Sequence, residues 1–243
     1  YSLYKTYVGV KKMANQDKEI FKIEDLEEYK KWISEQNWYQ RIYLKNGLST
    51  KAKLKTDSRI DWFNQFDFLN KTVLDIGCNS GQYSFHAKKA GASSVIGIDI
   101  DEKRIYQARM LAINEGIDVD FHLAGIEQVA KFGKFDVVIC IAVVTEVENV
   151  LGALRAIKNA TKKTAILEMD LARPLVYASS NKHWWKSDKV SRLGRVAEMH
   201  RHKHAGWVVH PSLEMVSEIF GNDFELTFLG QGLRYYKIVI HRK

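Results

Sequence analysis

Short apolar runs alternate with longer amphipathic segments between Thr72 and Met169, and this alternation restricts the fold more than any other feature of the sequence. Strands that alternate with helices of about ten residues or more are typical of a parallel sheet covered by helices on both faces. Asp101 is placed to cap one of the helices, and Gly116 to end it. The pattern predicts strands over 72–76, 94–99, 119–123, 135–142 and 164–169, and helices over 80–90, 102–115 and 147–160.

Further elements are expected on either side of this alternation. The sequence predicts a helix over 23–36 and another over 211–220, with Pro211 in its first turn. Two β-rich runs, 224–229 and 235–241, have no helix between them and predict an antiparallel hairpin on the sheet. We therefore expect an α/β fold with a doubly wound, Rossmann-like mixed sheet of seven strands.

The expected domain organisation follows from where the alternation begins and where it is interrupted. Residues 1–60 are expected to form an N-terminal helical and basic extension, and residues 61–243 the sheet domain. Residues 171–206 follow the fifth strand and break the alternation. An insertion of this length in an economical domain is usually functional or mobile, so we expect it to form a lid over a binding pocket.

The loop "VLDIGCNSG", from Val73 to Gly81, follows the first predicted strand, which is where open parallel sheets bind ligands. A dinucleotide-binding fingerprint that started at Gly77 would need glycines where Asn79 and Gln82 stand. The Gly-Lys-Ser/Thr end of a phosphate-binding P-loop is absent as well. The loop therefore does not have the pattern of a pyrophosphate or phosphate site.

Two acidic residues stand at the ends of neighbouring predicted strands. Asp75 ends the first strand, where a carboxylate suits a cationic group better than a pyrophosphate. Asp99 ends the second, in "VIGIDID", where a carboxylate can accept hydrogen bonds from both hydroxyls of a ribose. A ligand with a ribose, a base, a positive charge and no phosphate fits this pattern, and S-adenosylmethionine (SAM) is such a ligand.

The motifs "VLDIGCNSG" and "GIDID" resemble the first two motifs of class I SAM-dependent methyltransferases in kind, order and spacing. The resemblance covers about residues 72–170. It implies Asp75 near the methionine amino group, the Gly77–Gly81 loop around the methionine and ribose, and Asp99 on the ribose hydroxyls. The cofactor-binding residues expected on this basis are Asp75, Gly77, Cys78, Asn79, Gly81, Asp99, Ile100, Ile126, Glu127 and Ile141.

A second likeness is to the tRNA wobble-uridine carboxymethyltransferases, through "LAGIEQVAKFGKFDVVIC" (123–140) and "SRIDWF" (58–63). It implies that Ile126 packs against adenine and that Glu127 lies near the adenine amino group; the alternatives are a core side chain and a solvated loop acid. That family has a tyrosine–histidine pair after its fourth strand, where this sequence has Thr145 and Glu146. We therefore expect plain SAM as the cofactor.

The residues that would act on the acceptor are less sharply defined. Glu146 follows the fourth strand and is a candidate base, or else an acid that favours the start of a helix. His204 is a second candidate base. His200, His202 and His204 alternate, but no acid or cysteine completes a metal site, so none is expected. In the insertion, tryptophans among basic residues could stack on a ring and neutralise phosphate; the substrate-binding candidates are Trp184, Trp185, Lys186 and Arg192.

The net charge of +8 is concentrated in two stretches, 41–59 and 182–204, each with a net charge of +5. Basic clusters near aromatic residues suit an RNA backbone, although a solubilising surface has the same composition. Two acceptors therefore stay open: an oxygen or nitrogen on RNA, tRNA included, and a small molecule or sugar. A SAM-binding module without activity is disfavoured by the intact cofactor motifs.

The sequence also bears on the compartment. No apolar run approaches the roughly 20 residues that span a membrane, and the first residues show no signal-peptide pattern. The two cysteines, Cys78 and Cys140, lie in a glycine loop and in an apolar run, which does not suggest a disulfide framework. We expect a cytoplasmic protein without a membrane partner.

Overall fold

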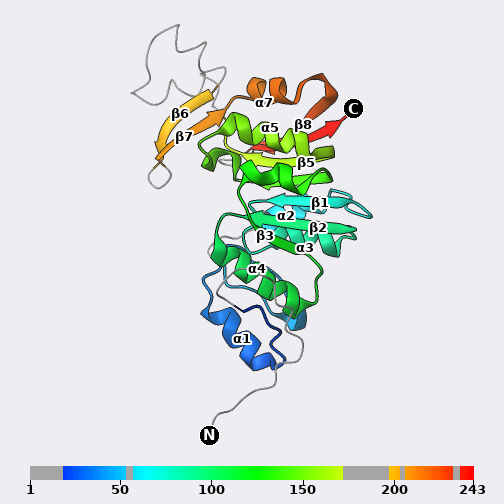
Figure 1. Ribbon diagram of the computed structural model, residues 1–243, viewed down its shortest axis with the longest axis vertical. Helices are drawn as coiled ribbons and strands as arrows, with labels where there is room; N and C mark the ends of the chain where they lie inside the picture. The colour runs from blue at the N-terminus through cyan, green and yellow to red at the C-terminus, as the bar shows by residue number, and fades with distance from the viewer. Residues whose placement is uncertain (1–18, 53–56, 172–196, 203–205, 232–235) are drawn as a thin grey trace. The chain divides into compact units, whose positions relative to one another are not determined.

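A computed structural model describes residues 19–52, 57–171, 197–202, 206–231 and 236–243 (Figure 1). Its main sheet has seven strands in the order β3-β2-β1-β4-β5-β9-β8. This confirms the expected α/β fold with a mixed seven-stranded sheet. The chain divides into two compact units, an N-terminal unit up to Ala124 and a C-terminal unit from Gly125, and each is described by itself.

The N-terminal unit contains three parallel strands and their helices. β1 pairs with β2 in parallel, with Thr72 opposite Ser94, and β2 pairs in the same way with β3. The helix expected over 102–115 is confirmed, because Asp101 accepts hydrogen bonds from the first-turn N–H groups and Gly116 ends the helix at φ 65°. The elements are α1 (Leu26–Glu35), η1 (Lys45–Gly47), α2 (Asp57–Phe63), β1 (Thr72–Ile76), α3 (Gln82–Lys89), β2 (Ser94–Asp99), α4 (Glu102–Glu115) and β3 (Asp120–Leu123).

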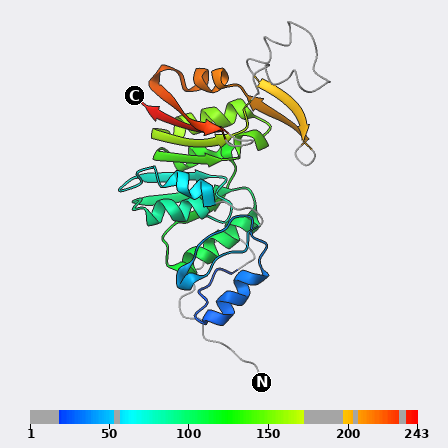
Figure 2. The same ribbon diagram turned by 180° about the vertical axis from the view of Figure 1, so that it is seen from behind.

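The helix α1 is built into this unit through its contacts with α4, which lies beside it in both views (Figures 1 and 2). Tyr29 and Ile33 of α1 share an apolar cluster with Ile105 and Leu111 of α4. The Tyr29 hydroxyl also donates a hydrogen bond of 2.9 Å to the buried Glu115 carboxylate. Burial of apolar surface on both helices therefore fixes the N-terminal segment on the outer side of α4.

The C-terminal unit contains the other four strands of the main sheet. β4 and β5 pair in parallel, and β9 pairs antiparallel with both β5 and β8, which confirms the expected terminal hairpin. Val138, Ile139 and Ile166 are fully buried, as expected for central strands with near-continuous apolar sequences. The elements are η2 (Ile126–Phe132), β4 (Phe135–Ile141), η3 (Val144–Glu146), α5 (Val150–Ala160), β5 (Thr161–Met169), β6 (Ala197–His202), β7 (Gly206–Pro211), α7 (Leu213–Phe220), η5 (Gly221–Asp223), β8 (Phe224–Gln231) and β9 (Tyr236–Arg242).

The strands β6 and β7 form a separate two-stranded antiparallel sheet that the sequence analysis did not predict. Pro211 is the last residue of β7, opposite Ala197, so the expected helix start at Pro211 is wrong. The helix α7 begins after Ser212, whose hydroxyl accepts a hydrogen bond of 3.1 Å from the N–H of Met215. In both views the β6–β7 ribbon extends away from the sheet layer of this unit (Figures 1 and 2), and β7 contacts η3 at the end of β4.

Among the residues that the structure describes, no helix is both long enough and apolar enough to cross a bilayer.

Candidate cofactor site

The loop after β1 is built by residues that accept a left-handed backbone. Gly77, Asn79 and Gly81 have φ angles of 71°, 52° and 91°, a region that glycine adopts freely and that asparagine tolerates. The N–H groups of Gly77 and Cys78 both donate to the Ile98 carbonyl, at 2.8 and 2.9 Å. The loop is therefore fixed to the carboxyl end of β2, where ligands bind in open α/β sheets.

Gly81 has a second, steric requirement for glycine. A Cβ atom at this position would lie 2.7 Å from the Phe121 ring and 3.0 Å from the Phe85 ring. Those two rings pack edge to face, with centroids 5.6 Å apart, in the core beneath the loop. The close approach of the loop to β3 therefore depends on the missing side chain.

The Asp99 carboxylate joins the glycine loop to the residue that caps α4. One oxygen, Oδ2, accepts a hydrogen bond of 2.8 Å from the N–H of Asn79, and the other, Oδ1, accepts one of 2.9 Å from the N–H of Asp101. Burial raises the pKa of this carboxyl above its ordinary value, and the two backbone hydrogen bonds oppose the rise. A carboxylate offers about four acceptor positions, so each oxygen can still accept a hydroxyl hydrogen.

Asp75 occupies a different environment on β1. Its carboxyl is 1% exposed and accepts a hydrogen bond of 2.6 Å from the Ser84 hydroxyl of α3. Burial raises the pKa of Asp75 to about 7, although the hydrogen bonds from Ser84 oppose this rise. Asp75 is thus a carboxyl that gains or loses its charge near neutral pH, directly below the glycine loop.

Two more of the predicted residues differ sharply in exposure. Ile100 follows Asp99 directly, and its side chain is 79% exposed. Cys78 is completely buried as a free thiol, and burial raises its pKa well above the ordinary value. Ile100 is therefore available to a flat ligand, whereas the side chain of Cys78 supports the loop from below.

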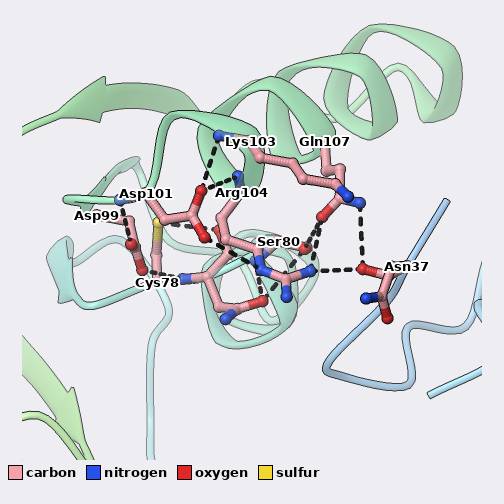
Figure 3. A network of polar contacts seen from close by, with 9 residues as sticks. Asn37, Cys78, Ser80, Asp99, Asp101, Lys103, Arg104 and Gln107 are labelled. Carbon is pink, nitrogen blue, oxygen red and sulfur yellow. Dashed lines mark hydrogen bonds and ion pairs between the residues drawn. The ribbon is translucent and has the colours of Figure 1, made fainter. Parts of the chain in front are cut away.

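A buried polar network holds the loop to α4 and to the N-terminal segment (Figure 3). The Ser80 hydroxyl donates to Oε1 of Gln107 at 2.9 Å, and Nε2 of Gln107 lies 3.4 Å from the Asn37 carbonyl. Arg104 donates to the same two oxygens, at 3.1 Å to Gln107 and 2.6 Å to Asn37. These residues were not predicted from the sequence as part of the site. The available signal was a polar Gln107 among the apolar positions Ile105, Ala108 and Leu111 on one helix face.

In the C-terminal unit, the predicted residues of "LAGIEQ" lie at the start of η2. Ile126 is buried at 8% exposure, and Glu127 is exposed. The N–H of Gly125 donates a hydrogen bond of 3.0 Å to the side chain of Gln128, which closes the start of this turn. Ile141, the last residue of β4, is also buried at 8% exposure.

The chain makes a sharp turn directly after β4. Ala142 has a φ angle of 57°, which is uncommon for a residue with a Cβ atom, and its N–H donates a hydrogen bond of 2.7 Å to the Glu168 carbonyl. The following η3 carries Thr145, which is buried, and Glu146, which is exposed. Glu146 was predicted from the sequence but Ala142 was not, because alanine has no preference for a left-handed backbone.

The predicted acceptor-binding residues lie outside the described part of the chain. Trp184, Trp185, Lys186 and Arg192 fall within 172–196, and His204 falls within 203–205. The backbones of His200 and His202 belong to β6, opposite Val208 and Gly206 of β7.

Comparisons with known proteins agree with this architecture. A family described as "Methyltransferase domain" matches residues 68–211. A ubiquinone biosynthesis O-methyltransferase of Pseudomonas paraeruginosa is 36% identical over 43% of this chain and 46% of its own length. A tRNA U34 carboxymethyltransferase of Campylobacter lari is 29% identical over 49% of this chain and 44% of its own length. This chain thus spans less than half of either curated relative.

A solved structure extends the likeness of the fold to most of the chain. The N-terminal domain of EvdMO1 with SAH bound is similar with a TM-score of 0.68 and 16% identity, over 90% of this chain and 97% of that one. At this identity the similarity concerns the fold. The family match, in contrast, covers more than half of the sequence, and we conclude that this chain belongs to the methyltransferase-domain family of class I SAM-dependent methyltransferases.

Proposed function

We propose that this chain transfers a methyl group from SAM to an oxygen or nitrogen atom of RNA. The main support for SAM as the methyl donor is the Asp99 carboxylate. Two backbone N–H groups fix it, and each of its oxygens can still accept a hydrogen bond. Such a carboxylate matches the two neighbouring hydroxyls of a ribose. The SAH bound by the EvdMO1 domain, which shares the fold, supports the same ligand class.

Different residues in and beside the glycine loop would bind different parts of SAM. Asp99 would accept hydrogen bonds from the ribose hydroxyls, and the exposed Ile100 would cover a face of the adenine. Gly77, Asn79 and Gly81 would let the backbone approach the methionine part closely. SAM supplies a methyl group that is already activated by its positive sulfur.

Asp75 would contribute negative charge beneath the glycine loop. Its carboxyl is buried with one oxygen bonded to Ser84, so it would attract the cationic part of SAM across a short, poorly screened distance. Binding of a cation would in turn lower the pKa of Asp75 from about 7 and favour its charged form.

The C-terminal unit offers further groups for the same reaction. Ile126 and Ile141 are buried apolar residues that would pack against the adenine, and Glu127, which follows Ile126, is an exposed acid that would lie near the adenine amino group. Glu146 on η3 is exposed and free to act as a general base where the acceptor needs to lose a proton. β7, which follows the 171–206 insertion in the sequence, contacts the η3 turn on which Glu146 lies.

RNA is the acceptor that charge favours, because the net charge of +8 is concentrated in two clusters with aromatic residues. The relative that is named a tRNA U34 carboxymethyltransferase supports the same class. A second candidate, a small hydroxylated molecule, is favoured by the relative named a ubiquinone biosynthesis O-methyltransferase, which is 36% identical. Thr145 and Glu146 stand where the wobble-uridine carboxymethyltransferases have tyrosine and histidine, so we propose plain SAM as the methyl donor.

The test separates SAM binding from acceptor identity. Calorimetry first measures SAM binding by the wild-type chain and by Asp99→Ala, which removes the ribose acceptors. Methyl transfer from labelled SAM is then followed in fractionated cell extract, before and after treatment with ribonuclease. We expect SAM binding that depends on Asp99 and label that ribonuclease releases.

Each other outcome has a defined meaning. Label that survives ribonuclease and migrates as a small molecule would replace RNA with the second candidate. Wild-type protein that does not bind SAM would overturn the proposed activity as a whole.

A further inference from the structure

The segment before η1 presents an alternating surface. Tyr39 and Tyr43 are 43% and 56% exposed, whereas Trp38, Gln40 and Ile42 are at most 6% exposed. Buried and exposed side chains thus alternate along the segment, and its backbone bends at Tyr39 and Gln40. Two large aromatic rings are therefore exposed within five residues, and the half-buried Arg41 lies between them in the sequence.

Hydrogen bonds hold this segment in place along its buried face. The Gln82 amide of α3 donates to the Arg41 carbonyl at 2.7 Å. The Thr50 hydroxyl donates to the Gln40 carbonyl at 2.7 Å and accepts from the N–H of Ile42 at 2.8 Å. The two exposed rings are therefore carried by a fixed backbone, so little backbone entropy would be lost when a ligand binds.

The charged side chains of the segment itself have one sign. Residues 37–52 include Arg41, Lys45 and Lys51 and contain no acidic residue. Lys89 adds a further cation, since its Nζ lies 3.3 Å from the Tyr43 carbonyl. A surface of fixed aromatic rings among cations complements a polyanion that carries flat, unpaired rings.

We propose that the exposed side chains of Tyr39 and Tyr43, together with Arg41, Lys45 and Lys51, form a binding surface for single-stranded RNA. Tyr39 and Tyr43 stack on unpaired bases, and the basic side chains contact the phosphates. Duplex RNA keeps its bases stacked on each other and offers no free ring faces, so it binds this surface less tightly. The proposal rests on the proposed function for its choice of RNA, because it names a docking site for the RNA acceptor.

The contact with Gln82 gives this surface a place relative to the glycine loop. Gln82 is the first residue of α3, directly after Gly81, and its amide holds the backbone at Arg41. Bound RNA would therefore lie on the same unit as the loop and Asp99.

The test measures binding of a fluorescent, unstructured RNA oligonucleotide by anisotropy. The Tyr39→Ala/Tyr43→Ala double variant removes both rings, and Tyr39→Phe/Tyr43→Phe keeps them without the hydroxyls. We expect binding that is roughly ten-fold weaker or more for the alanine variant and close to wild type for the phenylalanine variant. Arg41→Gln should lower the dependence of binding on salt, with a log–log slope smaller by about 0.7, and Arg155→Gln, an exposed arginine of α5, is its matched control.

Calorimetry with SAM on the same variants distinguishes a failure of the RNA surface from a failure of the proposed function. We expect SAM affinity and thermal stability of the alanine variant to match the wild type, because both rings are exposed. The proposed RNA surface would be wrong if the alanine variant bound RNA as tightly as the wild type, or if the matching duplex bound more tightly than the single strand. It would also be wrong if a wild-type chain that binds SAM did not bind RNA. Loss of SAM binding by the wild type would overturn the proposed function instead.

Discussion

The Ser80 hydroxyl donates a hydrogen bond of 2.9 Å to the side-chain oxygen of Gln107, and both residues are completely buried. Ser80 belongs to the glycine loop, and Gln107 lies in the middle of α4. The Gln107 amide also reaches the Asn37 carbonyl, 70 positions away in the sequence. The loop that we assign to SAM is therefore held by a helix and by the N-terminal segment at the same time.

Gln107→Ala should lower both stability and SAM affinity. The substitution leaves the buried Ser80 hydroxyl without this acceptor and removes a donor to the Asn37 carbonyl, which costs about 1–3 kcal/mol. Thermal unfolding and SAM calorimetry on the same preparation measure the two effects. Gln65→Ala, at an exposed glutamine, is the control. A Gln107→Ala protein that melts and binds SAM like the wild type would show that the network does not position the loop.

Asp99→Ala should weaken SAM binding by about 2–3 kcal/mol, roughly a 30- to 150-fold rise in Kd, because two charge-assisted hydrogen bonds to the ribose are lost. Asp101→Ala is the matched control. It removes the N-cap of α4, which costs stability of about 1 kcal/mol, but it leaves the Asp99 carboxylate in place. Equal SAM affinities of the wild type and Asp99→Ala would contradict the ribose assignment.

Asp75 should make stability fall as pH rises. Its pKa is raised from an ordinary value of 3.8 to about 7, so between these values the folded protein holds a proton that the unfolded chain has released. Stability is therefore highest below this window and decreases until the pH passes 7. Asp75→Asn, which stays neutral, should be more stable than the wild type at pH 8 by on the order of 2–4 kcal/mol.

The same residue should make SAM affinity change with pH in the opposite direction. As the pH falls below about 7, Asp75 becomes protonated and the attraction for the cationic ligand weakens. Asp75→Asn should bind SAM weakly and without this pH dependence. Denaturant unfolding and calorimetry over a pH series measure both properties, with the exposed Asp61→Asn as control. An Asp75→Asn protein that shows the wild-type pH profile would exclude Asp75 as the group responsible.

Local signals predicted those parts of the fold that local interactions determine. Asp101 and Gly116 mark the two ends of α4 because a cap and a left-handed terminus involve only neighbouring residues. The apolar runs of the central strands were equally clear, since both of their faces are buried. The apolar run of "VIGIDID" also located Asp99 at the end of β2 correctly.

Contacts between distant residues could not be predicted in the same way. The bond from Gln107 to Asn37 and the bond from Tyr29 to Glu115 join positions that no periodicity connects. Pro211 has a suitable φ angle for the first turn of a helix, but it also fits the end of a strand, and pairing with Ala197 decided between them. The capping hydroxyl of Ser212 was the better local signal for the start of α7.

The left-handed backbone at Ala142 leads to the last prediction. A residue with a Cβ atom at a φ of 57° costs on the order of 1–2 kcal/mol, which glycine avoids. Part of this gain is offset because glycine loses more entropy on folding. Ala142→Gly should therefore raise Tm by a few degrees at most, Ala142→Asn should come close to it, and Ala142→Val should lower Tm clearly.

The position of Ala142 adds a functional expectation to this series. Its N–H bonds to the Glu168 carbonyl at 2.7 Å, and η3 with Glu146 follows directly. If the turn fixes the place of Glu146, relief of the strain should lower kcat while Tm rises. Asn70→Gly is the matched control, since Asn70 also has a positive φ but lies in the turn before β1. A drop in Tm for Ala142→Gly would show that the strain at this turn is smaller than the entropy cost of glycine. An unchanged kcat at a higher Tm would show that the strain does not act on Glu146.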